Sequence, residues 1–368
     1  MRSKSLTILA ILTVVSVAAA VAAVYQRGSI SRIAAPPDEL FPGLIDRVND
    51  VAAVSVVTPE GAFTIRKGAD DAWLMAEKSD YPVQFETIKQ AVVGMASLRP
   101  LEAKTVKADK YPRLQVADPT PDDAGNGEGT LIRLEDAGGG EIAGLIVGKT
   151  KSVETSSRPG WYYVRKPGDA QSWLASGRIE VFENATGWLD ATMIRIERTR
   201  IRAAETVQPD GAALQISRTD PRGRDFDVDN VPEGGKVSFD TAPNALGSAL
   251  TYISFDDVRP AADVDFENAG TAVFSTFDGL VVTTELADID DVTWVRFSAA
   301  FDEAAVALDG LSEDDAKAMM SADDVKAEAE QINTRYGVWA YRLPDYKIKD
   351  LRTALSDVVT SGDGDGKS

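Results

Sequence analysis

A short segment of this chain occurs twice. Residues 60–75 read EGAFTIRKGADDAWLM, and residues 210–228 read DGAALQISRTDPRGRDFDV. In both copies a turn that contains proline and glycine precedes a strand with alternating apolar side chains, and a second turn leads to a further strand. The apolar positions correspond in pairs: Phe63 with Leu214, Ile65 with Ile216, Trp73 with Phe226, and Met75 with Val228. This repetition predicts a structural unit that is built twice.

The elements that follow this segment also recur in the same order. An apolar face at helical spacing occurs in both copies, and it is closed by LRP at residues 98–100 and by VRP at residues 258–260. A hairpin around a glycine turn and the strand segments 161–165 and 293–297 complete the two copies. The first helical face consists of Phe85, Ile88, Val92, Met95 and Leu98, and the second of Leu246, Leu250 and Ile253.

We therefore predict an α+β fold of two similar β-rich units that arose by internal duplication, each an antiparallel sheet with one packed helix. Chance similarity between two α+β patterns is the alternative. The predicted bounds are residues 45–193 for the first repeat and 194–355 for the second. The second repeat contains a helical insert at residues 311–335, where Ser312 and Ser321 each precede an aspartate by three residues, as N-caps do. A strand and one amphipathic helix follow, and residues 356–368 are predicted to be a flexible tail.

The start of the chain predicts a membrane anchor. Residues 6–25 carry no charged side chain and follow Arg2 and Lys4. Twenty residues in a helix rise about 30 Å, which is the thickness of the hydrocarbon core of a bilayer. Tyr25 and Arg27 lie where an interfacial anchor belongs. We therefore predict a transmembrane signal-anchor, with a cytoplasmic tip before it and a polar tether after it, at residues 6–25, 1–5 and 26–44 respectively.

A cleaved signal peptide is the alternative for this segment. Residues 20–22 read AVA, which has the small-x-small pattern of a cleavage site. The apolar region of a cleaved signal is usually about 7–15 residues long, shorter than this one, and the length favours an uncleaved anchor. Both interpretations place the rest of the chain outside the cytoplasm, because no later segment of the sequence is long and apolar enough to span a membrane.

Charge and residue types exclude several classes of function. The chain has 58 acidic and 39 basic residues, for a net charge of −19. This excess repels a phosphate backbone, and we expect no nucleic-acid partner. The chain contains neither cysteine nor histidine, which excludes disulfides, thiol or histidine catalysis, and the usual zinc sites. Carboxylate, lysine, tyrosine or serine chemistry remains, as does a metal site made of oxygen ligands.

Two motifs resemble ligand-binding loops but fit structural roles better. Residues 148–150 read GKT, as at the end of a phosphate-binding loop, but Ala143 stands where that loop needs glycine, and a strand is predicted next. Residues 225–230 read DFDVDN, as at the start of a calcium loop, but Asn230 and Lys236 stand where that loop needs glycine and glutamate. The three aspartates are more simply the solvent face of a strand.

Acidic and aromatic clusters are the remaining candidates. Residues 263–268 and 287–291 could supply a carboxylate pair for acid–base work, although nothing in the sequence brings them together. A sugar platform or, more simply, core packing would explain a group of aromatic side chains: Trp161, Tyr162, Tyr163, Trp173 and Trp188. We therefore name no catalytic, cofactor-binding or metal-ligating residue, and we expect no cofactor.

Several further segments carry a family resemblance. In chain order they are LFPGLIDRVNDVAAVSV, FTIRKGADDAWLMAEKSDYPV, EAKTVKADKYPRLQVADP, WYYVRKPGDAQSWLA and INTRYGVWAYRLPDYK. With them the chain resembles a bacterial family, domain-of-unknown-function family 4340, although many relatives have Tyr-Gly-Leu where this chain reads YPRL at residues 111–114. Members of that family look like single-span or exported proteins, often encoded beside an ABC-type transporter of the gliding-motility kind and its large auxiliary membrane protein. The resemblance implies no catalytic residues.

The resemblance and the anchor together lead to one expected function and two alternatives. We expect a non-enzymatic accessory protein, held in the bacterial inner membrane with its body in the periplasm, that contacts an ABC transporter permease and an auxiliary membrane subunit. A periplasmic module that binds envelope glycans or lipids, with a cleft between the two repeats, is the first alternative. A carboxylate-dependent hydrolase is the second.

Overall fold

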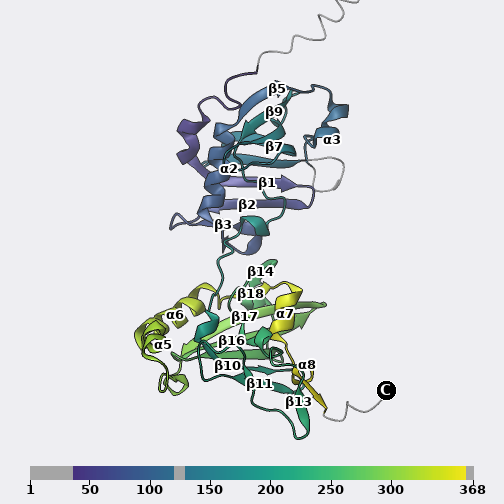
Figure 1. Cartoon of the computed structure of the whole chain (residues 1–368). Helices are drawn as coiled ribbons and strands as arrows, with labels where there is room; N and C mark the ends of the chain where they lie inside the picture. Colours follow the sequence, from purple (N-terminus) through teal and green to yellow (C-terminus); the bar gives the residue numbers. More distant parts are fainter. Residues whose placement is uncertain (1–35, 120–128, 362–368) are drawn as a thin grey trace, which may run out of the picture. The chain divides into compact units, whose positions relative to one another are not determined.

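A computed structural model describes residues 36–119 and 129–361 of the chain. These residues form two compact units, each with one large antiparallel sheet (Figure 1). The first unit consists of the described residues up to Asp71 and of Phe85–Asn184; the second consists of Ala72–Gln84 and of the described residues from Ala185 onward. The fold is therefore α+β with antiparallel sheets, as the sequence predicts. The predicted anchor at residues 6–25 lies outside the described residues, among which no helix is long and apolar enough to cross a membrane.

Within the first unit, seven strands of the nine-stranded sheet run in the order β2-β1-β6-β7-β8-β9-β5, and the neighbours in this run are antiparallel. The strands are β1 (Val51–Thr58), β2 (Gly61–Lys67), β5 (Arg99–Ala103), β6 (Thr130–Asp136), β7 (Glu141–Ser152), β8 (Gly160–Arg165) and β9 (Ser172–Gly177). The helices are α2 (Phe85–Ser97) and the short α3 (Tyr111–Leu114), with 3-10 turns η1 (Leu44–Asp50) and η3 (Ala108–Lys110).

The apolar face of α2 explains how this helix covers the sheet. Ile88, Val92 and Met95 are buried at helical spacing, as predicted, and Leu98 is buried just before β5 begins at Arg99. The prediction for Phe85 is wrong, because its side chain is 62% exposed. Phe85 is the first residue of the helix, one turn before the face that packs on the sheet.

The second unit contains a sheet in the order β12-β11-β10-β15-β16-β17-β18-β14, a small sheet of β13 and β19, and the hairpin of β3 and β4. Its strands are β3 (Trp73–Met75), β4 (Tyr81–Pro82), β10 (Ile201–Val207), β11 (Ala213–Ser217), β12 (Asp227–Val228), β13 (Gly235–Val237), β14 (Asp257–Pro260), β15 (Gly270–Thr276), β16 (Leu280–Ile289), β17 (Val292–Phe301), β18 (Trp339–Arg342) and β19 (Val359–Ser361). Its helices are α4 (Asn244–Gly247), α5 (Glu313–Ala318), α6 (Ala322–Arg335), α7 (Asp345–Leu351) and α8 (Leu355–Val358), with 3-10 turns η2 (Ala76–Lys78), η4 (Thr186–Trp188), η5 (Arg198–Arg200), η6 (Ala261–Asp263) and η7 (Glu303–Ala305).

The hairpin of β3 and β4 comes from the first half of the sequence but groups with the second unit. Tyr81 packs edge-on against Phe255 and Trp339, with ring centroids 5.7 and 4.9 Å away. Lys78 pairs with Asp257 at 2.6 Å. Aromatic contacts and a half-buried ion pair therefore hold this hairpin to the unit.

The two large sheets share one strand order. The strand order β2-β1-β6-β7-β8-β9-β5 in the first unit corresponds, strand for strand, to the order β11-β10-β15-β16-β17-β18-β14 in the second. The pairing register matches as well, because Val54 pairs with Ile65 in the first unit and Ala204 pairs with Ile216 in the second. The pairwise correspondence that the sequence predicts between Ile65 and Ile216 is thus present in the hydrogen-bonding pattern.

The predicted second helix is much shorter than its counterpart. Only Asn244–Gly247 is helical, although Leu246, Leu250 and Ile253 are buried as predicted. Gly247 weakens the helix, and a Cβ at this position would overlap the ring of Phe226. The predicted apolar face is therefore buried, but it is formed by one helical turn and the irregular chain that follows it.

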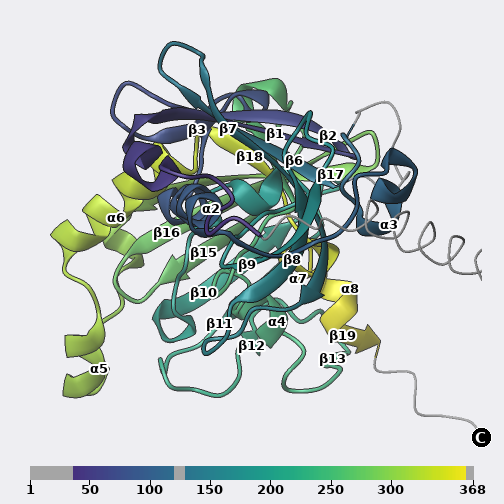
Figure 2. The same ribbon diagram turned by 90° about the horizontal axis from the view of Figure 1, so that it is seen from above.

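The helical insert of the second unit forms α5 and α6. Ser312 and Ser321 accept hydrogen bonds from the backbone N–H groups of Asp315 and Asp324, which confirms both predicted N-caps. Figure 2 shows α6 alongside β16. The insert has more apolar contact than its sequence suggests, because α6 buries three side chains: Val325, Ala329 and Ile332.

An ion network fixes α6 to the sheet. The guanidinium of Arg200 pairs with Asp278 at 2.8 Å and with Glu328 of α6 at 2.8 Å. The Asp278 carboxylate is fully buried, and it also accepts hydrogen bonds from Thr276 and from the backbone of Met320. Because the carboxylate lies in a dry site, these partners are needed to keep it charged.

The chain end differs from the prediction of one amphipathic helix and a tail from residue 356. Two short helices, α7 and α8, follow β18 and are separated at Arg352 and Thr353. The carbonyl groups of these two residues accept hydrogen bonds from the side chains of Gln208 and Thr206, which ends the helical pattern. Ordered structure then continues to Ser361, because β19 pairs with β13.

Candidate binding groove

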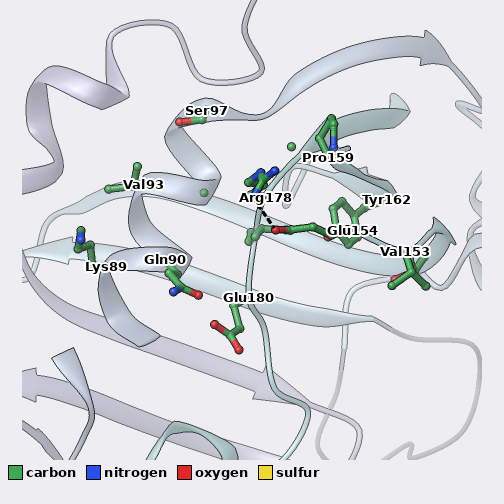
Figure 3. Close-up of a pocket in the computed structure, with 14 residues that line it drawn as sticks. Lys89, Gln90, Val93, Ser97, Val153, Glu154, Pro159, Tyr162, Arg178 and Glu180 are labelled. Carbon is green, nitrogen blue, oxygen red and sulfur yellow. Dashed lines mark ion pairs between the residues drawn. The ribbon is translucent and has the colours of Figure 1, made fainter. Parts of the chain in front are cut away.

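A groove of about 1010 Å³ lies in the first unit between α2 and the ends of β8 and β9 (Figure 3). Helix α2 contributes Val93 and Gly94, the segment between β7 and β8 contributes Val153 and Pro159, and the chain after β9 contributes Arg178 and Ile179. Its volume lies at the upper end of the range typical of ligand pockets. It is the site that we consider for function.

Two glycines allow the backbone segments around the groove to lie close together. A Cβ at Gly94 would overlap the carbonyl oxygen of Arg178 and lie 2.9 Å from the Cα of Ile179. A Cβ at Gly177 would lie 2.7 Å from Cδ2 of Leu98. Helix α2 therefore packs directly on the chain that leaves β9, and residues of this contact line the groove.

Tyr162 lies in the groove, with its side chain mostly buried. Burial is the main cause that raises the pKa of its phenol, and the charge of nearby Glu154 raises it further. Gly160 leaves room for the phenol, because a Cβ there would overlap the Tyr162 hydroxyl. The phenol therefore stays neutral at physiological pH and can act as a hydrogen-bonding group.

The rim of the groove carries charges of both signs. Arg178 pairs with Glu154 at 3.4 Å and donates to the carbonyl of Ser156 at 3.1 Å. Lys89 pairs with Glu86 at 3.1 Å on the outer surface of α2. Glu180 lies on the side of Gln90, away from the Arg178–Glu154 pair (Figure 3). Glu180 is exposed, and its side chain has no hydrogen bond or ion pair among the described residues.

Apolar side chains lie between these charges and remain open to solvent. Val93 on α2 is 36% exposed, and Val153 in the segment after β7 is 76% exposed. Partly exposed aliphatic groups beside a charged rim suit the noncovalent binding of an amphipathic molecule or segment.

The phosphate-loop candidate lies in a strand. Residues 148–150 form part of β7, which extends to Ser152, and no helix follows it directly. The structural interpretation of this motif is confirmed. Gly148 has a packing role, because a Cβ there would overlap the backbone carbonyl oxygens of Leu114 and Gln115.

The calcium-loop candidate is also part of a strand. Phe226 is buried while Asp227 and Asp229 are exposed, which confirms the predicted alternation around β12. Asp229 accepts a hydrogen bond from Ser217, and Asp225 accepts one from Asn244. Within residues 36–119 and 129–361, no group of acidic residues is arranged to hold a metal ion.

The two acidic segments come near each other through their apolar residues rather than their carboxylates. Val264 and Phe266 share one core cluster with Ala287 and Trp294. All the aspartates and glutamates of these segments are exposed. Asp288 pairs with Arg352 at 2.7 Å. This arrangement gives no support to a hydrolytic carboxylate pair, which requires two acidic groups that face one another across a cleft.

The aromatic group divides between the core and the surface. Trp188 and Tyr162 are buried, as the core interpretation predicts. That interpretation is wrong for Trp161, which is 39% exposed and has the ammonium group of Lys151 5.5 Å from its ring centroid. Trp173 and Tyr163 are half-buried. These side chains therefore do not form one platform.

The residues of the groove escaped the sequence analysis, apart from Tyr162 and Thr150 of the phosphate-loop candidate. The one local signal was Gly94, a glycine in the middle of a predicted amphipathic helix, which often marks a close packing contact. Val153 and Glu180 lie in irregular segments whose periodicity is uninformative. The groove depends on how α2 meets the ends of two strands, which is a tertiary arrangement.

Comparison with known proteins confirms the resemblance. The chain matches the family model described as Domain of unknown function (DUF4340) over residues 73–269, which is more than half of its length. The matched region begins at β3 and ends just before β15. No curated protein matches the chain. The chain therefore belongs to the family described as Domain of unknown function (DUF4340).

Proposed function

We propose that this chain is a membrane-anchored periplasmic accessory protein that supports an ABC-type transport system through protein contacts and has no catalytic role. The observation that carries the proposal is the open groove of the first unit, with exposed Val93 and Val153 on its walls. Exposed aliphatic groups in a concave surface are characteristic of protein-binding sites. The uncharged segment at residues 6–25 supports a location at the inner membrane, with the body in the periplasm.

Family membership supports the choice of partner, because members of this family are often encoded beside ABC transporters of the gliding-motility kind. The partners in this proposal are the transporter permease and its auxiliary membrane subunit. The net charge of −19 favours basic partner surfaces, since complementary charge raises the rate and specificity of association.

Affinity purification of the full chain at native expression, in mild detergent, tests the proposal. The permease and the auxiliary subunit should be recovered with it above the level of an untagged control. Recovery of the chain alone, also after crosslinking in intact cells, would overturn the proposed function.

A ligand-binding module for envelope glycans or lipids is the second candidate. The volume of the groove, about 1010 Å³, favours it, because it would hold a molecule of drug-like or larger size. Thermal unfolding of the purified chain in the presence of envelope lipids and glycan fragments tests this candidate. A specific rise in the melting temperature supports it, and an unchanged melting temperature across the panel removes it.

We also propose that the two units arose by internal duplication. Two observations support this origin. The two sheets share one strand order, and Ile65 and Ile216 occupy equivalent positions, each paired with the corresponding strand of its own unit. The two copies have since diverged at their ends, where the second unit carries α7 after its β18 strand and the first unit leads into the second.

A further inference from the structure

The second unit contains a counterpart of the groove. It encloses about 610 Å³ and is lined by Thr293 near the start of β17 and by Asp256 just before β14. The larger groove of the first unit is lined by Tyr162 near the start of β8 and by Ser97 just before β5. Since β17 and β14 occupy the places of β8 and β5 in the shared strand order, the two hollows are at equivalent ends of their sheets.

In the second unit, the chain places a helix of its own at this end of the sheet. Helix α7 begins shortly after β18, and Ile348 and Lys349 of α7 line the counterpart. Lys347 is only 6% exposed, and its Nζ atom donates to the carbonyl oxygen of Ala249, close to α4, at 3.0 Å. A short helix with two lysines and two aspartates therefore packs against the α4 segment at this end of the sheet.

The first unit has no such helix. Residues 178–184, which follow β9, contain no helical residue. The hollow there is larger, about 1010 Å³ against about 610 Å³, and Val93 and Val153 are exposed along it. The exposed carboxylate of Glu180 has no hydrogen-bond or ion-pair partner among the described residues. An apolar wall and an unpaired acidic group are thus left open where the second unit places α7.

We propose that the groove of the first unit binds a short amphipathic helix of a partner protein, in the place that α7 takes in the second unit. The apolar face of that helix lies on Val93 and Val153, and a lysine or arginine pairs with Glu180. Grooves with aliphatic walls bind helices through side chains at helical spacing. Lys89 and Arg178 on the rim are already paired with Glu86 and Glu154, so the carboxylate of Glu180 favours a basic side chain on the bound helix. The inference rests on the proposed function for the identity of the partner, which is a periplasmic segment of the transport subunits.

Site-specific photocrosslinking of the full chain in native membranes tests this inference. The chain contains no cysteine, so Val153→Cys creates a unique thiol in the groove for a benzophenone maleimide. The crosslinked peptide is then sequenced by mass spectrometry. We expect it to come from a basic segment of a transport subunit with apolar residues at helical spacing. Phe239→Cys, at another exposed apolar position in the second unit, is the labelling control and should not give this product.

A matched pair of charge substitutions tests the role of Glu180. Glu180→Lys should lower the crosslinking yield from Val153→Cys by about tenfold, because the basic helix then meets a like charge in place of its partner. Glu183→Lys makes the same charge change at an exposed position that does not line the groove. It should leave the yield unchanged, and equal losses in both variants would overturn the assignment of Glu180.

The outcomes separate this inference from the proposed function. If the transport subunits purify with the chain but the groove crosslinks only to lipid, to a second copy of this chain or to nothing, the inference is wrong and the function stands. If the groove crosslinks to a basic amphipathic helix of another protein while the transport subunits are absent, the groove assignment stands and the function is wrong. If the transport subunits do not purify with the chain and the groove does not crosslink to a basic amphipathic helix, both the proposed function and the inference about the groove are wrong.

Discussion

At the scale of single residues, the packing of this chain depends on glycines at close backbone contacts and on one buried carboxylate. Gly94, Gly148 and Gly177 each stand where a Cβ would press against a neighbouring segment. Asp278 is charged in a fully buried place because Arg200 and Thr276 surround its carboxylate. Both kinds of residue lead to substitutions whose effect can be measured.

Gly94→Ala should lower the free energy of unfolding of the first unit. Alanine gains about 1 kcal/mol over glycine as a helix former. The new Cβ would nevertheless overlap the backbone of Arg178, and overpacking of this kind costs about 1–3 kcal/mol. Urea unfolding measures the difference, with Val93→Ala as the neighbouring surface control. A more stable Gly94→Ala protein would mean that α2 does not pack on this segment as described.

Asp278→Asn should destabilise the second unit by about 3–5 kcal/mol, because it leaves Arg200 with one charged partner in a largely buried place. Burial alone would raise the pKa of Asp278, but hydrogen bonds from Arg200 and Thr276 and the charge of Arg200 together lower it. A carboxyl group whose pKa is lower in the folded state stabilises the fold above its unfolded pKa, and this stabilisation is lost as the pH falls through the folded pKa.

Thermal unfolding of the wild type and of Asp278→Asn, measured between neutral pH and about pH 2, therefore tests the ion network around Asp278. The wild type should lose stability more steeply below about pH 4 than Asp278→Asn does. Asp288→Asn, at a half-exposed pair with Arg352, is the control and should have a small effect. Parallel pH curves for the wild type and Asp278→Asn would contradict the account of the network.

At the scale of elements, the two copies differ mainly in their helices. Helix α2 has a full apolar face, whereas its counterpart is reduced to α4 and a coil. The second unit compensates with α6 and α7, of which α6 is fixed to the sheet by Arg200 and Glu328. No counterpart of α7 follows β9 in the first unit, where residues 178–184 contain no helical residue.

Ser321→Ala should lower the unfolding free energy of the second unit by about 1 kcal/mol, because Ser321 caps α6. Ser312→Ala removes the equivalent cap from α5, which has no buried residue, and should change global stability by less than about 0.5 kcal/mol. Hydrogen exchange should detect faster opening of α6 in the first variant and of α5 in the second. Equal global losses would contradict the unequal packing of the two helices.

The strands and turns of this fold are largely predictable from the sequence, whereas the groove is not. Alternation at Phe63 and Ile65 and the turn residues before them are local signals, and both strands are present. The limits of the prediction lie where tertiary contacts decide. Gly247 and the ring of Phe226 shorten the second helix, and Thr206 and Gln208 bind the carbonyl groups of Thr353 and Arg352 just after α7 ends. The groove lies between segments far apart in sequence, and no local pattern encodes it.

At the scale of the whole molecule, the predicted anchor at residues 6–25 precedes a body of two compact units. If residues 6–25 are an uncleaved anchor, the protein purified from membranes should have an intact mass that includes them. It should also stay in the membrane fraction after washing at alkaline pH. A mature mass that begins after the AVA pattern at residues 20–22, together with release by the wash, would establish the signal-peptide alternative.

The central claim is that the groove of the first unit joins this chain to the transport subunits. Quantitative affinity purification of full-length wild type, Val93→Asp and Val93→Ala from native membranes tests it most directly. Val93 is partly exposed, so both substitutions should leave the fold intact, but the aspartate places an unpaired charge on the apolar wall. We expect the permease and auxiliary subunit to be recovered with wild type and Val93→Ala and reduced about tenfold with Val93→Asp. Equal recovery with all three proteins, or no recovery with wild type, would contradict the claim.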